Sequence, residues 1–443
     1  MNITIIGCGK SGLAAAKLGV HLGYNVRLTE SKDIDKFQNE YLELKKLGVK
    51  CEFGLNSFKF FENCDLVITS PGIPPNNKLI KKLESKQYEI ISELEFAYRY
   101  CKGKIIAITG TNGKTTTTAL IAHILNYAGR KAIACGNIGY AFSEAIMNNT
   151  NSSDIFVVEA SSFQLDRIKT FAPDVAIILN ITPDHLDYHK TFENYINAKY
   201  KITSFQKENN LLILNYDDDT IKNNLIKTSS KINYFSLNRV EWGLYVKDNE
   251  IIFENADKEE IIMHTSKLGL AGVHNLYNSM AAILAARAFE IKNEDIRDSL
   301  MSFKGVEHRL EKVREINKVL FINDSKATNV NSTYFALSSY QNPIIWIAGG
   351  RAKDNDYSSL DELVARNVKL IVLIGEEKDN IFNHFCLSKT CLRAESLEEA
   401  VNLAYENASE NDIVLFSPAC KSFDMFLNFE DRGEKFKDIV NNL

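Results

Sequence analysis

The sequence lacks the features that mark several large classes of protein. Its eight cysteines are scattered through 443 residues and form no C-x-x-C pair, which is typical of reduced thiols rather than of a disulfide framework. No basic segment precedes the first apolar run, which breaks at Gly7, so we expect no signal peptide. No apolar stretch approaches membrane-spanning length. These absences favour a cytoplasmic protein that has no membrane partner.

An excess of positive charge is also missing, because the formal net charge is −5 at pH 7. This balance disfavours a nucleic-acid partner. The apolar content of 45% and the charged content of 25% are those of a globular protein. The chain is too long for one ordinary core, and we find no repeat, low-complexity tract or long linker in it.

Strand-like and helix-like segments alternate along the whole chain, which predicts an α/β protein with mainly parallel sheets and flanking helices. We expect three domains. These are a Rossmann-like domain at 1–92, a central P-loop ATPase domain at 93–304 and a second Rossmann-like domain at 305–443. Short alternating runs between 234 and 264 predict a small antiparallel insertion.

Residues 105–125, "IIAITGTNGKTTTTALIAHIL", pass from a predicted strand to a predicted helix through a glycine turn. Backbone N–H groups of such a turn, together with the helix N-terminus, form a cradle for polyphosphate. Lys114 can reach the terminal phosphates, and the Thr115 hydroxyl can ligate Mg²⁺. The strict P-loop pattern would need glycine where Ile108 stands. We predict that ATP contacts Gly110, Thr111, Asn112, Gly113, Lys114, Thr115 and Thr116.

A second glycine motif favours a different function when it is taken alone. Gly7, Gly9 and Gly12 form G-x-G-x-x-G, and Glu30 ends the next predicted strand, as in dinucleotide-binding oxidoreductases. A UDP-linked ligand satisfies the same geometry, and so does a glycine turn that only packs a helix on a strand. The separate phosphate loop argues against a dehydrogenase, which needs no Mg-triphosphate site.

Further polar residues follow predicted strands, where ligand sites of open α/β sheets lie. Glu159 could hold Mg²⁺ with Thr115. For Lys199 the default is a solvated charge on a helix, and for Asn275 and Asn278 it is capping of a helix. The remaining groups are ambiguous one by one, and together they indicate an interdomain cleft: Asn180, Asp184, His185, Asp187, His189, His308, Arg309, Asp324, Lys326, Thr328 and Lys353.

In their order along the chain these motifs resemble the Mur ligase family, over essentially the whole length. The resemblance rests on "GTNGKTT", "GNIG", "EASSFQLD", "ITPDHLDYH", "HNLYN", "EHRLE", "NDSKATN", "GGRAKDNDY" and "SPACKSFDMFLNFEDRGEKF". "SSFQLD", "NDSKATN" and the C-terminal motif are similar to the D-glutamate-adding branch. The D-N-P-R motif of diaminopimelate- or lysine-adding members is absent. Asn112 stands where L-alanine-adding members carry a histidine. "GCGKSG" and "TESK" match the family only loosely.

The resemblance implies an ATP-dependent ligase in a cytoplasmic step of peptidoglycan precursor synthesis. ATP would phosphorylate the carboxylate of UDP-N-acetylmuramoyl-L-alanine, and the amine of D-glutamate would displace the phosphate. The cofactors would be two Mg²⁺ ions, one held by Thr115 and Glu159 and the other by His185 and a carbamylated Lys199. We expect a monomer whose partners are these small molecules, with a hinge near Lys304–Gly305.

The resemblance also implies roles for other residues. Asn137 and His185 would touch the muramoyl substrate, and Asn275, Arg309 and Asp324 the nucleotide. D-Glutamate would contact Thr328, Lys353, Ser422 and Phe423. The UDP end would contact Ser11, Ser31, Ser70 and Gly72.

Three alternatives remain open at this point. A folylpolyglutamate-type or other amide ligase shares the ATPase motifs, and the C-terminal motif argues against it. The nicotinamide oxidoreductase would use the first glycine motif. A non-catalytic nucleotide switch would use only the phosphate loop.

Overall fold

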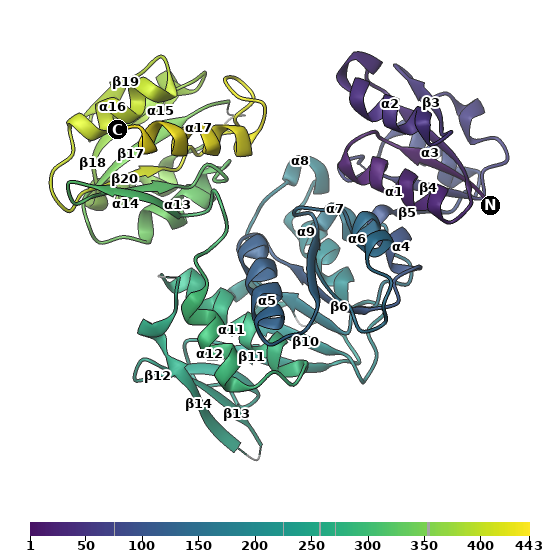
Figure 1. Ribbon diagram of the computed structural model, residues 1–443, viewed down its shortest axis with the longest axis horizontal. Coiled ribbons are helices and arrows are strands. Elements are labelled where there is room, and N and C mark those ends of the chain that lie inside the picture. Colours follow the sequence, from purple (N-terminus) through teal and green to yellow (C-terminus); the bar gives the residue numbers. More distant parts are fainter. Residues whose placement is uncertain (75, 225, 257, 271, 352–354) are drawn as a thin grey trace. The chain divides into compact units, whose positions relative to one another are not determined.

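The computed structural model describes residues 1–443 except 75, 225, 257, 271 and 352–354, and contains three sheets (Figure 1). The described chain divides into two compact units. The first unit comprises Met1–Leu268 and Tyr277–Ser302, and the second comprises Gly269–Leu276 and Phe303–Leu443. The three sheets and their helices confirm the predicted α/β class. The predicted boundary at 92/93 falls inside the first unit, between its two sheets, and stays a prediction.

The first sheet has the strand order β3-β2-β1-β4-β5, and all its pairs are parallel. The turn after β1 needs glycine, because a Cβ on Gly12 would lie 2.0 Å from the carbonyl oxygen of Gly7. The strands are β1 (Asn2–Ile6), β2 (Asn25–Glu30), β3 (Lys50–Phe53), β4 (Leu66–Thr69) and β5 (Ile90–Ser92). The helices are α1 (Lys10–His21), α2 (Gln38–Lys46), α3 (Lys78–Ser85) and α4 (Glu93–Tyr98).

The second sheet has nine strands in the order β14-β13-β12-β11-β10-β9-β6-β8-β7. The strands are β6 (Lys104–Thr109), β7 (Ala132–Gly136), β8 (Ile155–Glu159), β9 (Val175–Ile178), β10 (Leu211–Asn215), β11 (Lys231–Phe235), β12 (Gly243–Lys247), β13 (Glu250–Asn255) and β14 (Lys258–His264). The helices are α5 (Lys114–Tyr127), α6 (Phe142–Asn148), α7 (Ser162–Leu165), α8 (Leu186–His189), α9 (Phe192–Tyr200), α10 (Asp219–Asn223), α11 (Val273–Ala288) and α12 (Asn293–Ser302).

The predicted antiparallel segment is present as β12, β13 and β14, but it extends the main sheet instead of forming a separate insertion. The link is a parallel pairing of β11 with β12, in which Tyr234 is the partner of Gly243. A Cβ on Gly243 would lie 1.8 Å from the carbonyl oxygen of Tyr234, so this close approach requires glycine.

The third sheet has the order β15-β16-β20-β17-β18-β19, and only the pair β15–β16 is antiparallel. Its strands are β15 (Glu311–Ile316), β16 (Val319–Asn323), β17 (Ile344–Gly349), β18 (Val368–Ile374), β19 (Cys391–Arg393) and β20 (Ile413–Phe416). Its helices are α13 (Val330–Ser338), α14 (Asp361–Asn367), α15 (Lys378–Phe385), α16 (Leu397–Glu406) and α17 (Phe429–Asn441). Because β16 and β20 are parallel neighbours, the loops that follow them leave the same edge of the sheet.

Among the helices that the structure describes, none has both the length and the apolar character needed to cross a membrane.

Candidate active site

The predicted phosphate loop joins β6 to α5 in the first unit. Gly113 has φ +82°, and a Cβ there would lie 2.4 Å from Oδ1 of Asn278, so the turn depends on glycine at this position. The ammonium of Lys114 curls back over the loop and donates to the carbonyl oxygens of Gly110 at 2.9 Å and Thr111 at 2.8 Å. The ammonium of Lys114 thus lies at the N-terminus of α5, where a helix end and a cation both favour an anion; phosphate binding by this loop stays a prediction.

The side chain of Asn180, which follows the neighbouring strand β9, holds the phosphate loop in place. No such role was predicted for Asn180 from the sequence. Its Oδ1 accepts the backbone N–H groups of Thr111 at 3.1 Å and Asn112 at 2.8 Å. Its Nδ2 donates to the carbonyl oxygen of Asn112 at 3.1 Å. Asn180 follows β9, which pairs with β6; a polar residue directly after a predicted strand was the only sequence signal for it.

Thr115 and Glu159 meet as the sequence predicts. Because β6 and β8 pair with Ile108 opposite Glu159, the carboxylate lies beside the first turn of α5. Thr115 Oγ1 donates to Glu159 Oε2 at 2.8 Å, and Asn137 Nδ2 donates to Glu159 Oε1 at 3.0 Å. Both Thr115 and Glu159 are buried. A buried hydroxyl and carboxylate, all oxygen donors, fit Mg²⁺.

Lys199 is buried, with 1% of its surface exposed. The default of a solvated helix lysine is therefore wrong, because α9 packs this face against the phosphate loop. Its Nζ donates to the carbonyl oxygen of Gly110 at 2.7 Å and lies 4.5 Å from the centre of the Tyr195 ring. Burial lowers the pKa of Lys199 well below its usual range, and the charge of Lys114 lowers it further.

His185 directly precedes α8 and has the left-handed conformation, with φ +52°. Its backbone N–H donates to Asp184 Oδ1 at 2.8 Å, and its exposed ring lies 4.9 Å from the ring centre of Phe163. The ring of Tyr195 is 6.4 Å from that of His185. Tyr195, which also contacts Lys199, therefore links the two predicted metal ligands.

The residues predicted for the UDP end follow three adjacent strands of the first sheet. Ser11 follows β1, Ser31 follows β2, and Ser70 and Gly72 follow β4. Ser70 Oγ donates to the carbonyl oxygen of Gly7 at 3.3 Å.

Glu30 binds the backbone of the first glycine turn itself. Its Oε2 accepts the N–H of Cys8 at 3.0 Å, and its Oε1 accepts Lys32 N–H at 3.0 Å and Ser31 Oγ at 3.2 Å. The carboxylate thus has a structural role in this turn, which weakens the dinucleotide interpretation.

In the second unit, Asp324 is buried directly after β16. Its Oδ1 accepts the N–H of Leu310 at 3.3 Å, and its Oδ2 accepts Ser417 Oγ at 2.8 Å. Burial raises the pKa of Asp324 to about 7, although the charge of Arg309 opposes that rise. Thr328 lies in the same loop, where its N–H donates to the carbonyl oxygen of Lys326 at 3.0 Å.

The predicted D-glutamate residues lie mainly in the loop after β20. Ser422 is buried, and its carbonyl oxygen accepts the N–H groups of Met425 at 3.2 Å and Phe426 at 2.9 Å. Phe423 is exposed over 60% of its surface. Lys353 lies outside the described residues.

The predicted residues fall into groups within each unit. In the first unit, Lys114, Lys199 and the Thr115–Glu159 pair gather around the phosphate loop, whereas the residues predicted for the UDP end lie at the first sheet. The second set comprises the described residues of the second unit that have a predicted ligand: Asp324 and Thr328 on the loop after β16, Ser422 and Phe423 on the loop after β20, Arg309 just before β15, and Asn275 in the first turn of α11. The loops after β16 and β20 are both contacted by the buried guanidinium of Arg432, through Ser325 and Cys420, and sequence reasoning missed this residue.

Three family descriptions match the chain: "Mur ligase MurD-like, N-terminal domain" over 1–92, "Mur ligase middle domain" over 108–286 and "Mur ligase, glutamate ligase domain" over 308–420. Curated relatives named UDP-N-acetylmuramoylalanine–D-glutamate ligase match along their whole length. The protein of Christiangramia forsetii is 42% identical, covering 100% of this chain and 99% of its own. That of Salinibacter ruber is 40% identical, covering 99% and 97%.

Solved structures share the fold. The UDP-N-acetylmuramate–alanine ligase of Thermotoga maritima is 20% identical with a TM-score of 0.62, covering 100% of this chain and 99% of its own. A MurF ligase of the same organism, in complex with ADP, is 17% identical with a TM-score of 0.59, covering 94% and 95%.

Proposed function

Because the chain belongs to the Mur ligase family, we propose that it joins D-glutamate to UDP-N-acetylmuramoyl-L-alanine at the expense of ATP. This is a step of peptidoglycan precursor synthesis. The relatives' names support the substrates, and one observation carries the chemistry. Lys114, Lys199 and the Thr115–Glu159 pair converge on a single glycine loop at a helix N-terminus.

The reaction needs ATP because a carboxylate is a poor acylating agent. A carboxylate oxygen of the alanyl group attacks the γ-phosphorus, and the bond to the leaving ADP oxygen breaks. The neutral amine nitrogen of D-glutamate then attacks the acyl carbon, the bond between that carbon and the phosphate oxygen breaks, and the nitrogen loses a proton as the amide forms and phosphate leaves. Lys114 and the N–H groups of the loop neutralise and orient the phosphates, which is the main requirement of phosphoryl transfer.

The buried oxygen set at Thr115 and Glu159 fits Mg²⁺, and we propose that these residues hold one ion while His185 and modified Lys199 hold a second. Bound Mg²⁺ would supply positive charge opposite the phosphates. Asn137 donates to Glu159 at 3.0 Å and so fixes the direction of that carboxylate. We propose that Asn137 and His185 also contact the muramoyl substrate.

We propose that Lys199 carries a carbamate. Its nitrogen is buried beside a second ammonium, that of Lys114, and both donate to one carbonyl oxygen. Addition of CO₂ to the neutral amine, with loss of a proton, forms an N–C bond and an anion. The modification would turn a repulsion between Lys114 and Lys199 into an attraction, and the anion could ligate metal.

In the second unit, we propose that Arg309 and Asp324 contact the nucleotide with Asn275, and that Ser422, Phe423, Thr328 and Lys353 bind D-glutamate. The exposed Phe423 ring and the buried Ser422 stand together on the loop after β20.

The test is phosphate release from ATP with UDP-N-acetylmuramoyl-L-alanine and a panel of D- and L-amino acids. We expect release that depends on both the nucleotide sugar and D-glutamate, with the amide product identified by its mass. Release with a folate acceptor and L-glutamate would instead favour the folylpolyglutamate-type alternative. ATP binding without amino-acid-dependent release would indicate a switch protein.

A further inference from the structure

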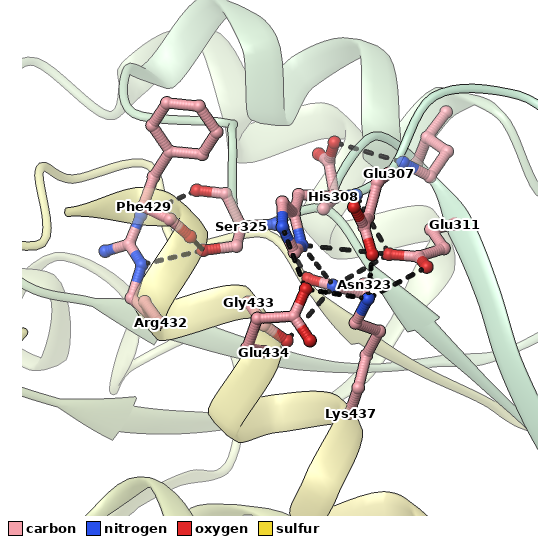
Figure 2. A network of polar contacts seen from close by, with 12 residues as sticks. Glu307, His308, Glu311, Asn323, Ser325, Phe429, Arg432, Gly433, Glu434 and Lys437 are labelled. Atoms are coloured by element: carbon pink, nitrogen blue, oxygen red, sulfur yellow. Dashed lines mark hydrogen bonds and ion pairs between the residues drawn. The ribbon is translucent and has the colours of Figure 1, made fainter. Parts of the chain in front are cut away.

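Arg432 is a buried arginine whose guanidinium contacts two loops, and Figure 2 shows its contacts with Ser325. It lies in the first turn of α17 with 0% of its surface exposed. Its Nε donates to Ser325 Oγ at 3.0 Å, its Nη2 to the carbonyl oxygen of Ser325 at 2.7 Å, and its Nη1 to that of Cys420 at 3.1 Å. All three nitrogens are therefore engaged, two with Ser325 and one with Cys420.

The two loops are those that carry most of the second set of candidate residues. Ser325 directly follows Asp324, and Cys420 stands two residues before Ser422. Because β16 and β20 pair in parallel with Asn323 opposite Phe416, both loops begin at the same edge of the sheet. Just past the strands, the loops are joined by the hydrogen bonds of Asp324 to Phe416 and Ser417. Farther along, the guanidinium holds the carbonyl oxygens of Ser325 and Cys420 together.

The cost of burying the Arg432 charge indicates that this residue fixes the geometry of the loops rather than adding to the stability of the fold. Burial lowers the pKa of Arg432 to about 10, so the group stays charged at neutral pH while it has given up its hydration. Replacing a buried charge with apolar packing is often neutral or stabilising. What an apolar side chain or a lysine lacks is a rigid planar fork with several fixed donor directions.

The other side of the same helical turn is fixed as well. Gly433 accepts a hydrogen bond from Asn323 Nδ2 at 3.3 Å, and the same nitrogen lies 3.0 Å from Nδ1 of His308. A Cβ on Gly433 would lie 2.3 Å from that Nδ1, so only glycine lets α17 approach so closely. His308 precedes Arg309, and Asn323 precedes Asp324, so the turn touches the neighbours of both candidate nucleotide contacts.

The nearby carboxylates do not form a metal site. Potential ligand atoms of Glu307, His308 and Glu434 come within 4.8 Å of one another. However, the ammonium of Lys437 pairs with Glu307, lies 3.0 Å from Glu434 Oε1 and 3.5 Å from Glu311 Oε1 (Figure 2). The Lys437 ammonium occupies the position that a metal ion would need. The cluster therefore connects α17 to Glu311 at the start of β15.

We propose that Arg432 is a positioning residue that holds the D-glutamate loop in register with the loop of Asp324. The proposal rests on the proposed function. The guanidinium touches no reacting atom. It fixes the distance between the loop that presents the attacking amine and the loop that contacts the nucleotide, and a displacement of about 1 Å can cost on the order of 100-fold in rate.

The experiment compares Arg432→Lys and Arg432→Ala with the full-length wild type. We expect Arg432→Lys to raise the KM for D-glutamate about tenfold or more and to lower kcat, because one ammonium cannot hold both loops. The affinity for UDP-N-acetylmuramoyl-L-alanine, measured by calorimetry, should not change. Added guanidinium or methylguanidinium should partly restore the D-glutamate KM of Arg432→Ala. Ser325→Ala, which removes one of the three acceptors, should give a smaller increase.

Lys435→Ala is the matched control, since Lys435 pairs with Asp431 on the exposed side of the same helix, and it should behave as wild type. A stable Arg432→Lys with a wild-type KM for D-glutamate would overturn the proposal. The proposal would also be overturned if the Arg432 variants lost thermal stability along with kcat and their affinity for every substrate, and if guanidinium did not restore Arg432→Ala.

Hydrogen exchange separates this inference from the proposed function. Arg432→Lys should exchange faster at 323–328 and 417–424 than wild type, with no change in the first unit. If the wild type shows no D-glutamate-dependent phosphate release, the proposed function fails. The exchange result then still decides whether Arg432 holds the two loops, and equal exchange in both proteins refutes it.

Discussion

Lys114 and Lys199 donate hydrogen bonds to the same atom, the carbonyl oxygen of Gly110, at 2.9 and 2.7 Å. Two ammonium groups at one neutral acceptor repel each other, and burial of Lys199 adds a desolvation cost. A nearby negative charge would relieve this repulsion, and in the proposed function the phosphates of ATP supply it at Lys114. A modified Lys199 would supply it from within the protein.

Lys114→Ala should abolish ATP turnover and leave the fold intact. Loss of a cation opposite transferring phosphates costs several kcal/mol of transition-state stabilisation, on the order of a thousandfold in rate. The measurement is phosphate release, with circular dichroism and thermal unfolding as checks of the fold. The exposed Lys102→Ala should retain wild-type activity. A folded Lys114→Ala enzyme with near-normal turnover would contradict the assignment of the loop.

Asn180→Ala should weaken ATP binding without removing any group that touches phosphate in our assignment. The Asn180 side chain makes three hydrogen bonds to the backbone of Thr111 and Asn112, and the loop loses them all in the variant. We expect the KM for ATP to rise on the order of tenfold or more, because each of the three lost hydrogen bonds contributes about 1 kcal/mol to the order of the loop. An unchanged KM would show that the glycines and α5 shape the loop unaided.

Asn180→Asp separates the two ends of this side chain. It keeps the Oδ1 acceptor but loses the donor to Asn112 and brings a negative charge toward the phosphates. The KM for ATP should therefore rise more than in Asn180→Ala, and high salt should reduce the difference. Equal KM values at low salt would contradict this electrostatic contribution.

The phosphate loop could be predicted from sequence because its residues are adjacent in the chain. Glycine, lysine and threonine between a strand and a helix specify the local backbone directly. Burial of Lys199 could not be predicted, because it depends on how α9 packs on a loop 89 residues away. Alternation predicted the antiparallel pairing of β12–β14, but did not show that their edge would join β11.

The role of Arg432 had no sequence signal at all. Its partner Ser325 is 107 residues distant, and an arginine in a polar helix is expected to be solvated. The motifs around both residues carried the resemblance to the Mur ligases. Only the three-dimensional contacts show that Arg432 of "NFEDRGEKF" is hydrogen-bonded to Ser325 of "NDSKATN".

Asp324 should make the second unit less stable as the pH rises from about 4 to about 7. Burial raises its native pKa from 3.8 to about 7, so between these values the folded state binds more protons than the unfolded state. The stabilisation is complete below the unfolded pKa and is lost as the pH approaches the folded pKa. The change is on the order of a few kcal/mol, since one pKa unit corresponds to about 1.4 kcal/mol.

Trp346 provides the measurement, because it is buried in the second unit and donates to the carbonyl oxygen of Ser417 at 2.7 Å. In a Trp242→Phe background its fluorescence reports urea unfolding of that unit alone. Asp324→Asn should flatten the pH dependence, whereas the exposed Asp379→Asn should leave it as in wild type. Equal slopes for wild type and Asp324→Asn would rule out a raised pKa.

Lys199→Ala should be nearly inactive, and a short carboxylic acid should partly restore its activity. The truncation leaves space beside the Gly110 carbonyl and the Tyr195 ring, which a small carboxylate can fill while it restores the negative charge of a carbamate. Lys199→Arg should stay inactive with the same acid, because guanidinium keeps the wrong charge and fills the space.

Labelling with ¹³CO₂ tests the modification directly. The neutral amine is the form that reacts with CO₂, and burial together with the charge of Lys114 lowers the pKa of Lys199 and so increases that form at neutral pH. We expect a ¹³C carbamate signal in the wild type that is absent from Lys199→Ala and persists in Lys201→Ala, whose lysine pairs with Asp166 instead. A bare amine in the active, metal-loaded enzyme would refute the carbamate. Rescue of Lys199→Ala by a small amine as well as by an acid would show that the site needs volume rather than negative charge.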